Sequence, residues 1–183
     1  MRNDFRSYKV AFISHCIINQ NSVVYGLARK EAILKKLIDL LHDYNIGLIQ
    51  LPCPETSYLG LRRFWQSKEQ YASMGFKSLC KKIAEQASTL ALEYVRNNYE
   101  IVAVIGIKGS PSCGVTETFS SDWIGDPSKA SDGKRVKGMG VFMEELKKSF
   151  EKRGIQVLFT DVDVHDIEKS VIELKKLLGG RFA

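Results

Sequence analysis

Hydrophobic residues along the chain follow two patterns, short uninterrupted runs and longer stretches with helical spacing. The short runs are apolar on both faces, which is typical of parallel strands in a sheet covered on both sides. The longer stretches place apolar residues three and four positions apart, which predicts amphipathic helices. The predicted strands are 10–14, 47–51, 101–107 and 156–160, and the predicted helices are 29–44, 75–98, 140–153 and 165–178.

The predicted strands alternate with the predicted helices. This order predicts a Rossmann-like, doubly wound α/β sheet, mostly parallel, with right-handed crossovers and helices on both faces. The length of 183 residues fits a single domain, 1–183. Two segments, about 54–74 and 110–138, lack periodicity, and we expect irregular loops over the carboxyl edge of the sheet there. Within the second, the basic stretch 128–138 is expected to be an exposed mobile loop rather than a lid.

Composition and charge narrow the class of protein. Apolar residues make up 44% of the chain, which is enough for a hydrophobic core. Charged residues make up 26%, an ordinary share for a globular protein. The net charge of +6 suits an anionic or polar partner, but the lysines fall mostly on helix faces, so nucleic acid is not expected. No run approaches the roughly 20 apolar residues of a membrane span, and the N-terminus does not resemble a signal peptide. We therefore expect a cytoplasmic protein with reduced thiols.

Three of the four cysteines follow predicted strands. Cys16 comes after the first strand, Cys53 after the second and Cys113 shortly after the third. Because the carboxyl ends of parallel strands meet at one edge, we expect these thiols to converge where open α/β sheets bind ligands. Cys80 instead lies on the apolar stripe of a predicted helix and is interpreted as a small core residue.

Spacing alone leaves the chemistry of the three thiols open. A structural zinc site needs a fourth ligand, and His15 adjoins Cys16 and should point the other way. An iron–sulfur cluster held by three cysteines would leave one iron open to act as a Lewis acid. The cysteines could also be small residues scattered near a ligand-binding edge.

The motifs around these cysteines carry a resemblance. In order, "SHCIINQN", "LPCPE" and "KGSPSCG" each follow a predicted strand, and "KGMGVFMEEL" enters the next helix. Together they resemble the 2-thiouracil desulfurase family over about residues 10–157. The segments "NSVVYGLAR", "TSYLGLRRFW" and "VTETFSSDW" replace elements typical of that family, so the chain looks like a divergent branch with a different substrate pocket.

The resemblance implies a cofactor and a set of site residues. In the family, three cysteines hold a 4Fe-4S cluster whose fourth iron is free to take the sulfur of a thiocarbonyl compound. By similarity, Cys16, Cys53 and Cys113 are the ligands, and Glu55 and Ser110 match catalytic positions. The implied function is a desulfidase that removes sulfur from a small thiolated, nucleobase-like compound by non-redox hydrolysis and releases hydrosulfide.

Several alternatives stay open at this point. Glu55 is expected to act as a general base, but it could be an exposed carboxylate at a helix start. Ser110 would orient water or substrate, or it would simply form a Ser-Pro turn. Arg62 and Arg63 would face an anionic part of a substrate or be solvated. The whole protein could instead be a non-enzymatic iron–sulfur or zinc sensor, or a nucleotide-binding domain with incidental cysteines.

Overall fold

A parallel four-stranded sheet forms the centre of the protein. The computed structural model describes residues 3–123, 125–126 and 133–182. The strands lie in the order β2-β1-β3-β6, and every neighbouring pair is parallel. This confirms the predicted α/β class with a mostly parallel sheet. The bounds are β1 Lys9–Ser14, β2 Gly47–Leu51, β3 Glu100–Ile107 and β6 Leu158–Val162.

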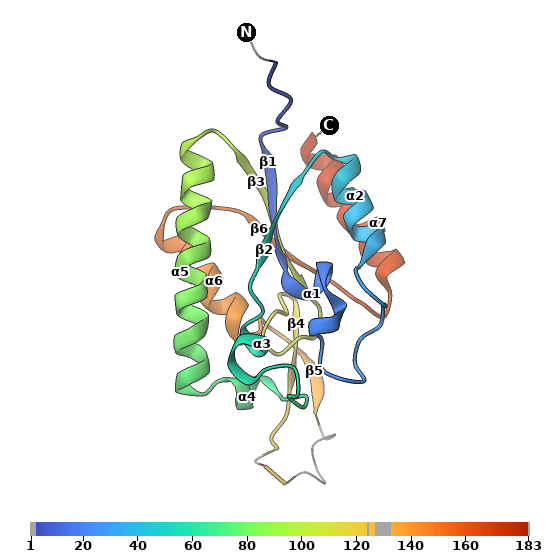
Figure 1. Cartoon of the computed structure of the whole chain (residues 1–183), viewed down its shortest axis with the longest axis vertical. Helices are drawn as coiled ribbons and strands as arrows, with labels where there is room; N and C mark the ends of the chain where they lie inside the picture. Colours follow the sequence, from blue (N-terminus) through green and yellow to red (C-terminus); the bar gives the residue numbers. More distant parts are fainter. Residues whose placement is uncertain (1–2, 124, 127–132, 183) are drawn as a thin grey trace.

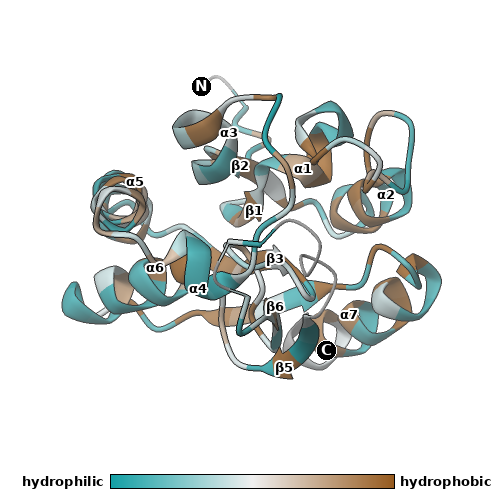
Figure 2. Cartoon of the chain, turned by 90° about the horizontal axis from the view of Figure 1, so that it is seen from below, coloured by the Kyte–Doolittle hydropathy of each residue, from teal (hydrophilic) through white to brown (hydrophobic). Residues whose placement is uncertain are grey.

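Helices cover both faces of the sheet, as the amphipathic pattern predicts. Helices α5 (Met74–Arg96) and α6 (Val141–Lys152) lie on one face, and α2 (Lys35–Asp43) and α7 (Ile167–Phe182) lie on the other (Figures 1 and 2). Each layer has its own apolar core. The first core is built around Phe12, Phe76, Val104, Phe142 and Phe150, and the second around Ile13, Leu37, Leu41, Ile105 and Leu178.

Some predicted elements begin later in the structure than the apolar pattern indicates, and backbone bonding explains two of them. Helix α2 starts at Lys35 rather than at residue 29. The preceding backbone is bonded elsewhere, because Gln20 N donates to Ala32 O at 2.7 Å and Leu34 N donates to Ile17 O at 2.8 Å. Strand β6 starts at residue 158 rather than 156, since its pairing with β3 begins where Leu158 meets Ala103.

The two segments without periodicity contain short regular elements that the pattern did not predict. Helices α3 (Pro54–Leu59) and α4 (Lys68–Tyr71) lie in the first. In the second, β4 (Glu117–Ser120) and β5 (Lys134–Lys137) form an antiparallel hairpin. Residues 128–132 of the basic stretch 128–138 lie outside the described residues. With α1 (His15–Ile18) and the 3-10 turn η1 (Gln20–Ser22), these elements gather at the carboxyl end of the sheet (Figure 1).

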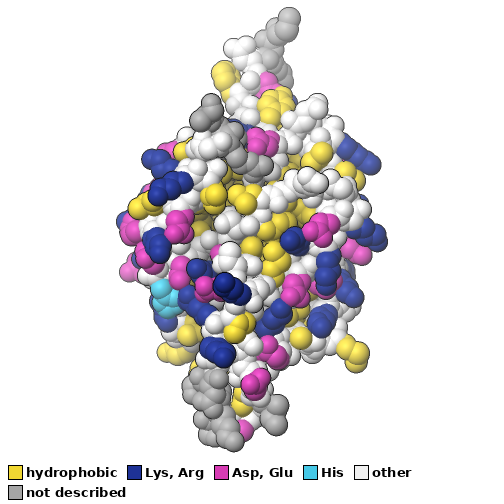
Figure 3. Space-filling view, turned by 180° about the vertical axis from the view of Figure 1, so that it is seen from behind, with side chains coloured by type: hydrophobic (Ala, Val, Ile, Leu, Met, Phe, Trp, Pro, Cys, Tyr) yellow, Lys and Arg dark blue, Asp and Glu magenta, His cyan; other side chains and the backbone are white. Residues whose placement is uncertain are grey.

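The face of the molecule on the β6 side shows how charge is distributed. Apolar side chains form a central strip there, with lysine, arginine, aspartate and glutamate side chains on both sides (Figure 3). Lys36 of α2 and Glu168 of α7 form an ion pair between the two helices. Among the described helices, none is both long enough and apolar enough to cross a membrane.

The loop that carries Cys113 approaches its neighbours more closely than a side chain would allow. A Cβ atom on Gly140 would lie 2.5 Å from the carbonyl carbon of Ser112, and one on Gly106 would lie 2.2 Å from Cys113 O. This close approach lets the first amides of α6 form hydrogen bonds with the loop. Val141 N donates to Pro111 O and Phe142 N donates to Ser112 O, both at 3.0 Å. The loop therefore caps α6 and is fixed by it.

We predict that Gly140→Ala destabilises the protein by about 1–3 kcal/mol, because the added methyl group collides with loop backbone that cannot move aside cheaply. The matched control is Gly180→Ala, at a helical position with open space around it. That change should stabilise the protein by roughly 0.5–1 kcal/mol through helix propensity. Urea unfolding measures both variants. Equal midpoints for Gly140→Ala and the wild type would show that the loop is not packed as described.

Candidate cysteine–carboxylate site

Three cysteines lie beyond the carboxyl ends of three neighbouring strands. Cys16 is in α1 directly after β1, Cys53 precedes α3 after β2, and Cys113 lies in the turn after β3. Because β1 pairs with both β2 and β3, the three segments that carry the cysteines are adjacent at one edge. The structure thus places the three cysteines where the strand pattern predicts.

Local backbone chemistry fixes two of these cysteines. Cys53 is the N-cap of α3, with Pro54 at the first helical position, where proline needs no amide partner. Cys113 sits in a tight turn, in which its amide donates to Ser110 Oγ at 3.0 Å and its carbonyl accepts from Ile107 N at 3.0 Å. The turn is pinned from the next strand. The Asp161 carboxylate accepts from the amides of Val115 and Thr116, both at 2.7 Å.

The thiols of the site influence one another's ionisation. Burial, followed by the neighbouring Cys53 and Glu55, raises the pKa of Cys16 to about 12. Burial also raises the pKa of Cys113 well above its usual value, with Cys16 and Cys53 contributing next. Such thiols are protonated at neutral pH unless a cation takes the place of the protons.

The donors around the sulfurs fit a thiolate-bound group. Thr56 N donates to Cys53 Sγ at 3.4 Å, and the Ser112 hydroxyl donates to Cys113 Sγ at 3.5 Å. Hydrogen bonds of this kind stabilise sulfur that carries negative charge. All four cysteines are free thiols. Soft sulfur donors favour iron–sulfur clusters or zinc over hard cations.

A site for a single metal ion is not formed by the described residues. In the ranges 3–123, 125–126 and 133–182, no three His, Cys, Asp or Glu side chains surround one ion position. His15, the alternative fourth ligand, contacts Gln50 and Asn19 through its two ring nitrogens. A cluster places its cysteines on different irons and does not require ligands around one point. Three soft sulfur donors on separate segments are compatible with such a cluster.

Glu55 is a buried carboxylate with three donors. The residue is 8% exposed, which excludes the alternative of a water-exposed group at a helix start. Its Oε2 accepts from Arg63 Nε at 3.2 Å and from the Tyr71 hydroxyl at 3.1 Å. Its Oε1 accepts from the Ser112 hydroxyl at 2.6 Å. Glu55 is thus linked through Ser112 to the cysteine loop.

The two serines of "SPSCG" have different roles in the structure. The Ser110 hydroxyl accepts from the Cys113 amide, which closes the turn, and lies 3.3 Å from the Ser112 hydroxyl. Ser112, not Ser110, contacts Glu55 and the Cys113 sulfur. Sequence reasoning missed Ser112. Its position next to Cys113 was a hint, but only the conformation of the turn decides which serine faces the carboxylate.

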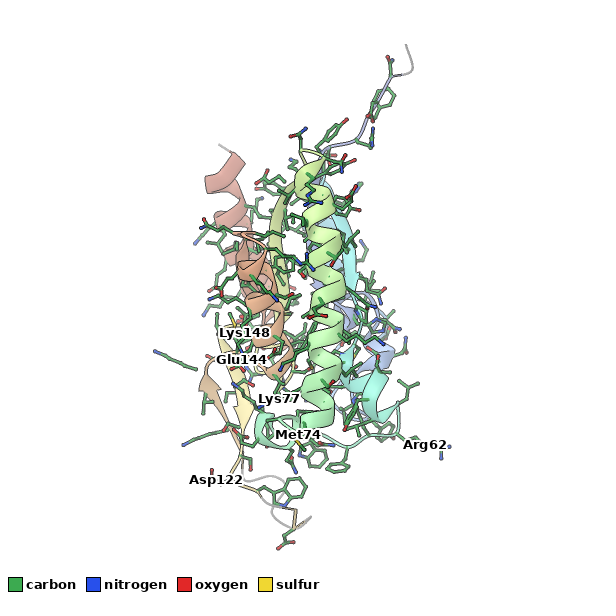
Figure 4. All side chains as sticks on the ribbon, turned by 90° about the vertical axis from the view of Figure 1, so that its left-hand side faces the viewer. Arg62, Met74, Lys77, Asp122, Glu144 and Lys148 are labelled. Carbon is green, nitrogen blue, oxygen red and sulfur yellow. The ribbon has the colours of Figure 1, made fainter. Side chains whose placement is uncertain are left out.

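The two arginines of "LRRFW" differ in the same way. Arg63 is buried and pairs with Glu55, so it is neither a solvated loop residue nor an open anion contact. Arg62 is exposed and projects away from the ribbon (Figure 4).

Tyr71 is a further site residue that had no signal in the sequence. Burial, with Glu55 next, raises the pKa of the Tyr71 hydroxyl, which therefore remains a donor at neutral pH.

Segment 54–74 and the β4–β5 hairpin are joined beside this site. Glu69 accepts from the Ser120 hydroxyl at 2.7 Å and from Ser121 N at 3.0 Å. The rings of Phe64 and Trp123 meet edge to face with centroids 6.2 Å apart.

The fourth cysteine lies outside the site. Cys80 is fully buried in the core, as the helical pattern predicts.

Comparisons with known proteins give a family match, a relative and a similar solved structure. A family model described as "Putative 2-thiouracil desulfurase" matches residues 8–134. The uncharacterized protein MJ0003 of Methanocaldococcus jannaschii is 34% identical over 172 residues, which are 93% of this chain and 97% of the relative. Among solved structures, the 4Fe-4S-dependent thiouracil desulfidase TudS aligns with a TM-score of 0.51 at 18% identity, covering 91% of this chain and 98% of that chain. The last similarity is one of fold.

The segment matched by the family model contains every residue of the site. It includes the three strand-end cysteines, the buried carboxylate and all of its hydrogen-bond donors. Because the match covers more than half of the chain and the relative is similar over nearly its full length, the chain belongs to the 2-thiouracil desulfurase family.

Proposed function

We propose that this protein is a cluster-dependent desulfidase that removes sulfur from a small thiocarbonyl compound, such as a thiolated nucleobase, and releases hydrosulfide. The observation that carries the proposal is the position of the Glu55–Ser112 pair against Cys113, at the edge where all three strand-end cysteines lie. Membership of the desulfurase family and the fold shared with TudS support it. A non-enzymatic sensor would need the thiols but would leave the buried Glu55–Arg63 pair without a role.

We assign Cys16, Cys53 and Cys113 as the ligands of a 4Fe-4S cluster. When bound, such a cluster supplies an iron with an open position that accepts soft sulfur and acts as a Lewis acid. The free thiols of these residues require a reducing compartment, and we place the protein in the cytoplasm.

The residues of the chain supply the rest of the chemistry. Water adds to the thiocarbonyl carbon, the C–S bond breaks, and the products are a carbonyl compound and hydrosulfide, so no net electrons are transferred. Glu55 Oε1 accepts the proton of the attacking water, and the Ser112 hydroxyl beside it orients that water. Ser110 assists by holding the turn that presents Ser112 and Cys113.

We predict that replacing any one of the three proposed ligands by serine removes most of the bound iron and acid-labile sulfide. Hydroxyl oxygen is a poor substitute for thiolate on iron. Cys80→Ser is the matched control, because Cys80 lies in the core and should affect stability but not iron content. Anaerobic reconstitution followed by iron and sulfide analysis measures this. Full iron content in a Cys53→Ser sample would remove Cys53 from the ligand set.

We predict that Glu55→Gln lowers hydrosulfide release by at least about 10²-fold, because the amide cannot accept the proton from water. Iron content should stay at the wild-type level, since the cysteines are unchanged. Glu168→Gln, at a surface ion pair on α7, is the control and should keep full turnover. The measurement is hydrosulfide production from 2-thiouracil or thioacetamide by anaerobically loaded protein. Undiminished turnover in Glu55→Gln would refute the assignment of the base.

A further inference from the structure

One oxygen of Glu55 is held by two residues that lie outside the cysteine loops. Arg63 Nε and the Tyr71 hydroxyl both donate to Oε2, whereas among the described residues Oε1 accepts a hydrogen bond only from the Ser112 hydroxyl. We propose that Arg63 and Tyr71 are positioning residues that lock Oε2 and so direct Oε1, together with Ser112, toward the cysteines. The proposal rests on the function proposed above and adds two residues of segment 54–74 to the site.

Arg63 can fix Glu55 because Arg63 is itself fixed. Its side chain is 2% exposed, and its remaining nitrogens donate to Ser22 O at 2.7 Å and to Gly60 O at 3.1 Å. Both acceptors are backbone carbonyls, which do not rotate as a side chain does. The guanidinium therefore sets the direction from which Glu55 Oε2 must approach, and a carboxylate held through one oxygen by a rigid partner has little rotational freedom.

Tyr71 supplies the second restraint from a different element. The residue is 2% exposed, and its ring packs against Phe76 with centroids 4.7 Å apart. A buried tyrosine has a single proton to donate, and here it goes to Glu55. Because Arg63 lies in the α3–α4 connection and Tyr71 ends α4, the two donors hold Oε2 from separate backbone positions.

The Ser112 hydroxyl transmits the position of Glu55 to the sulfur. It has one proton and three acceptors within reach, Glu55 Oε1 at 2.6 Å, Ser110 Oγ at 3.3 Å and Cys113 Sγ at 3.5 Å. The short distance to Oε1 shows that the carboxylate takes the larger share of this donor. If Glu55 rotates away, the proton of the Ser112 hydroxyl is shared between Ser110 Oγ and the Cys113 sulfur, so the sulfur gains a larger share of it. The restraint on Oε2 therefore decides how strongly Cys113 is hydrogen-bonded.

Stability alone is a weak reason for this arrangement. A buried ion pair gains little net free energy, because the cost of removing both charges from water offsets their attraction. An apolar pair of similar volume would fill the same space at least as well. A network that orients a carboxylate toward three thiols is better explained by the geometry that it imposes.

The experiment uses cluster-loaded protein prepared without oxygen and compares Arg63→Met and Tyr71→Phe with the control Arg62→Met, which alters an exposed neighbouring arginine. Hydrosulfide release from 2-thiouracil gives kcat and KM, and cluster content and reduction potential are measured on the same samples. We expect Arg63→Met to lower kcat by about 10²-fold, the scale of a misplaced catalytic group, with KM changed less than about threefold. We expect Tyr71→Phe to lower kcat by about tenfold, for one lost hydrogen bond.

The reduction potential gives a readout that does not depend on turnover. Hydrogen bonds to cluster sulfurs raise the potential. Tyr71→Phe changes no charge and should raise it, because the loosened Glu55 releases Ser112 to the sulfur. Ser112→Ala removes that donor and should lower it. Opposite shifts in these two variants, with full iron content in both, support the proposal.

Three outcomes separate the possibilities. If the wild type releases no hydrosulfide from thiocarbonyl probes, the proposed function fails, and the two potential shifts still decide whether Tyr71 acts through Glu55 and Ser112. If the wild type is active but Tyr71→Phe keeps the wild-type kcat and potential, the positioning role is wrong and the function stands. If kcat falls only in proportion to iron content, the residues merely support the fold and the proposal is overturned.

Discussion

The parallel pairing of β1 with both β2 and β3 is the constraint on which the site depends. Because all three strands run in one direction, the segments that follow them start at one edge, and each of these segments carries a cysteine. A reversed strand would send its cysteine to the opposite end of the sheet. The two apolar cores hold the register by burying both faces of β1 and β3. Cys113 belongs to the first core and Cys16 packs against the second, so the same packing fixes the position of these cysteines.

The site contains a group of sulfurs and a buried ion pair, and residues 53–71 contribute to both. Soft sulfurs lie on one side, and a charged carboxylate–guanidinium pair lies on the other, with the Ser112 hydroxyl between them. Residues 53–71 contribute Cys53, Glu55, Arg63 and Tyr71, and Glu69 ties this segment to the hairpin. A segment without hydrophobic periodicity thus contains the densest polar network of the site.

The features of this structure that could be predicted from the sequence are those that follow from the pattern of apolar residues. The strands follow from uninterrupted apolar runs, the layered helices from helical spacing, and the edge location of Cys16, Cys53 and Cys113 from their places after the strands. The pairing of Arg63 with Glu55 does not, because it depends on the path of a connection fixed by single hydrogen bonds to Ser22 and Gly60. Which of the two serines contacts Glu55 depends on the conformation of the turn that carries Cys113. The late start of α2 depends on backbone bonds to residues far away in the sequence.

The β4–β5 hairpin leaves and rejoins the body of the protein at almost the same place. Gly138 N donates to Thr116 O at 3.0 Å, and Gly140 N donates to Gly114 O at 2.9 Å. These hydrogen bonds hold the two ends of the hairpin segment next to each other. A chain closed at its base in this way can change in length at a cost of only about 0.6 kcal/mol for each doubling. Insertions and deletions beyond this base can therefore accumulate during evolution while the sulfur ligands keep their places, which allows related proteins to vary the covering of the site independently of its chemistry.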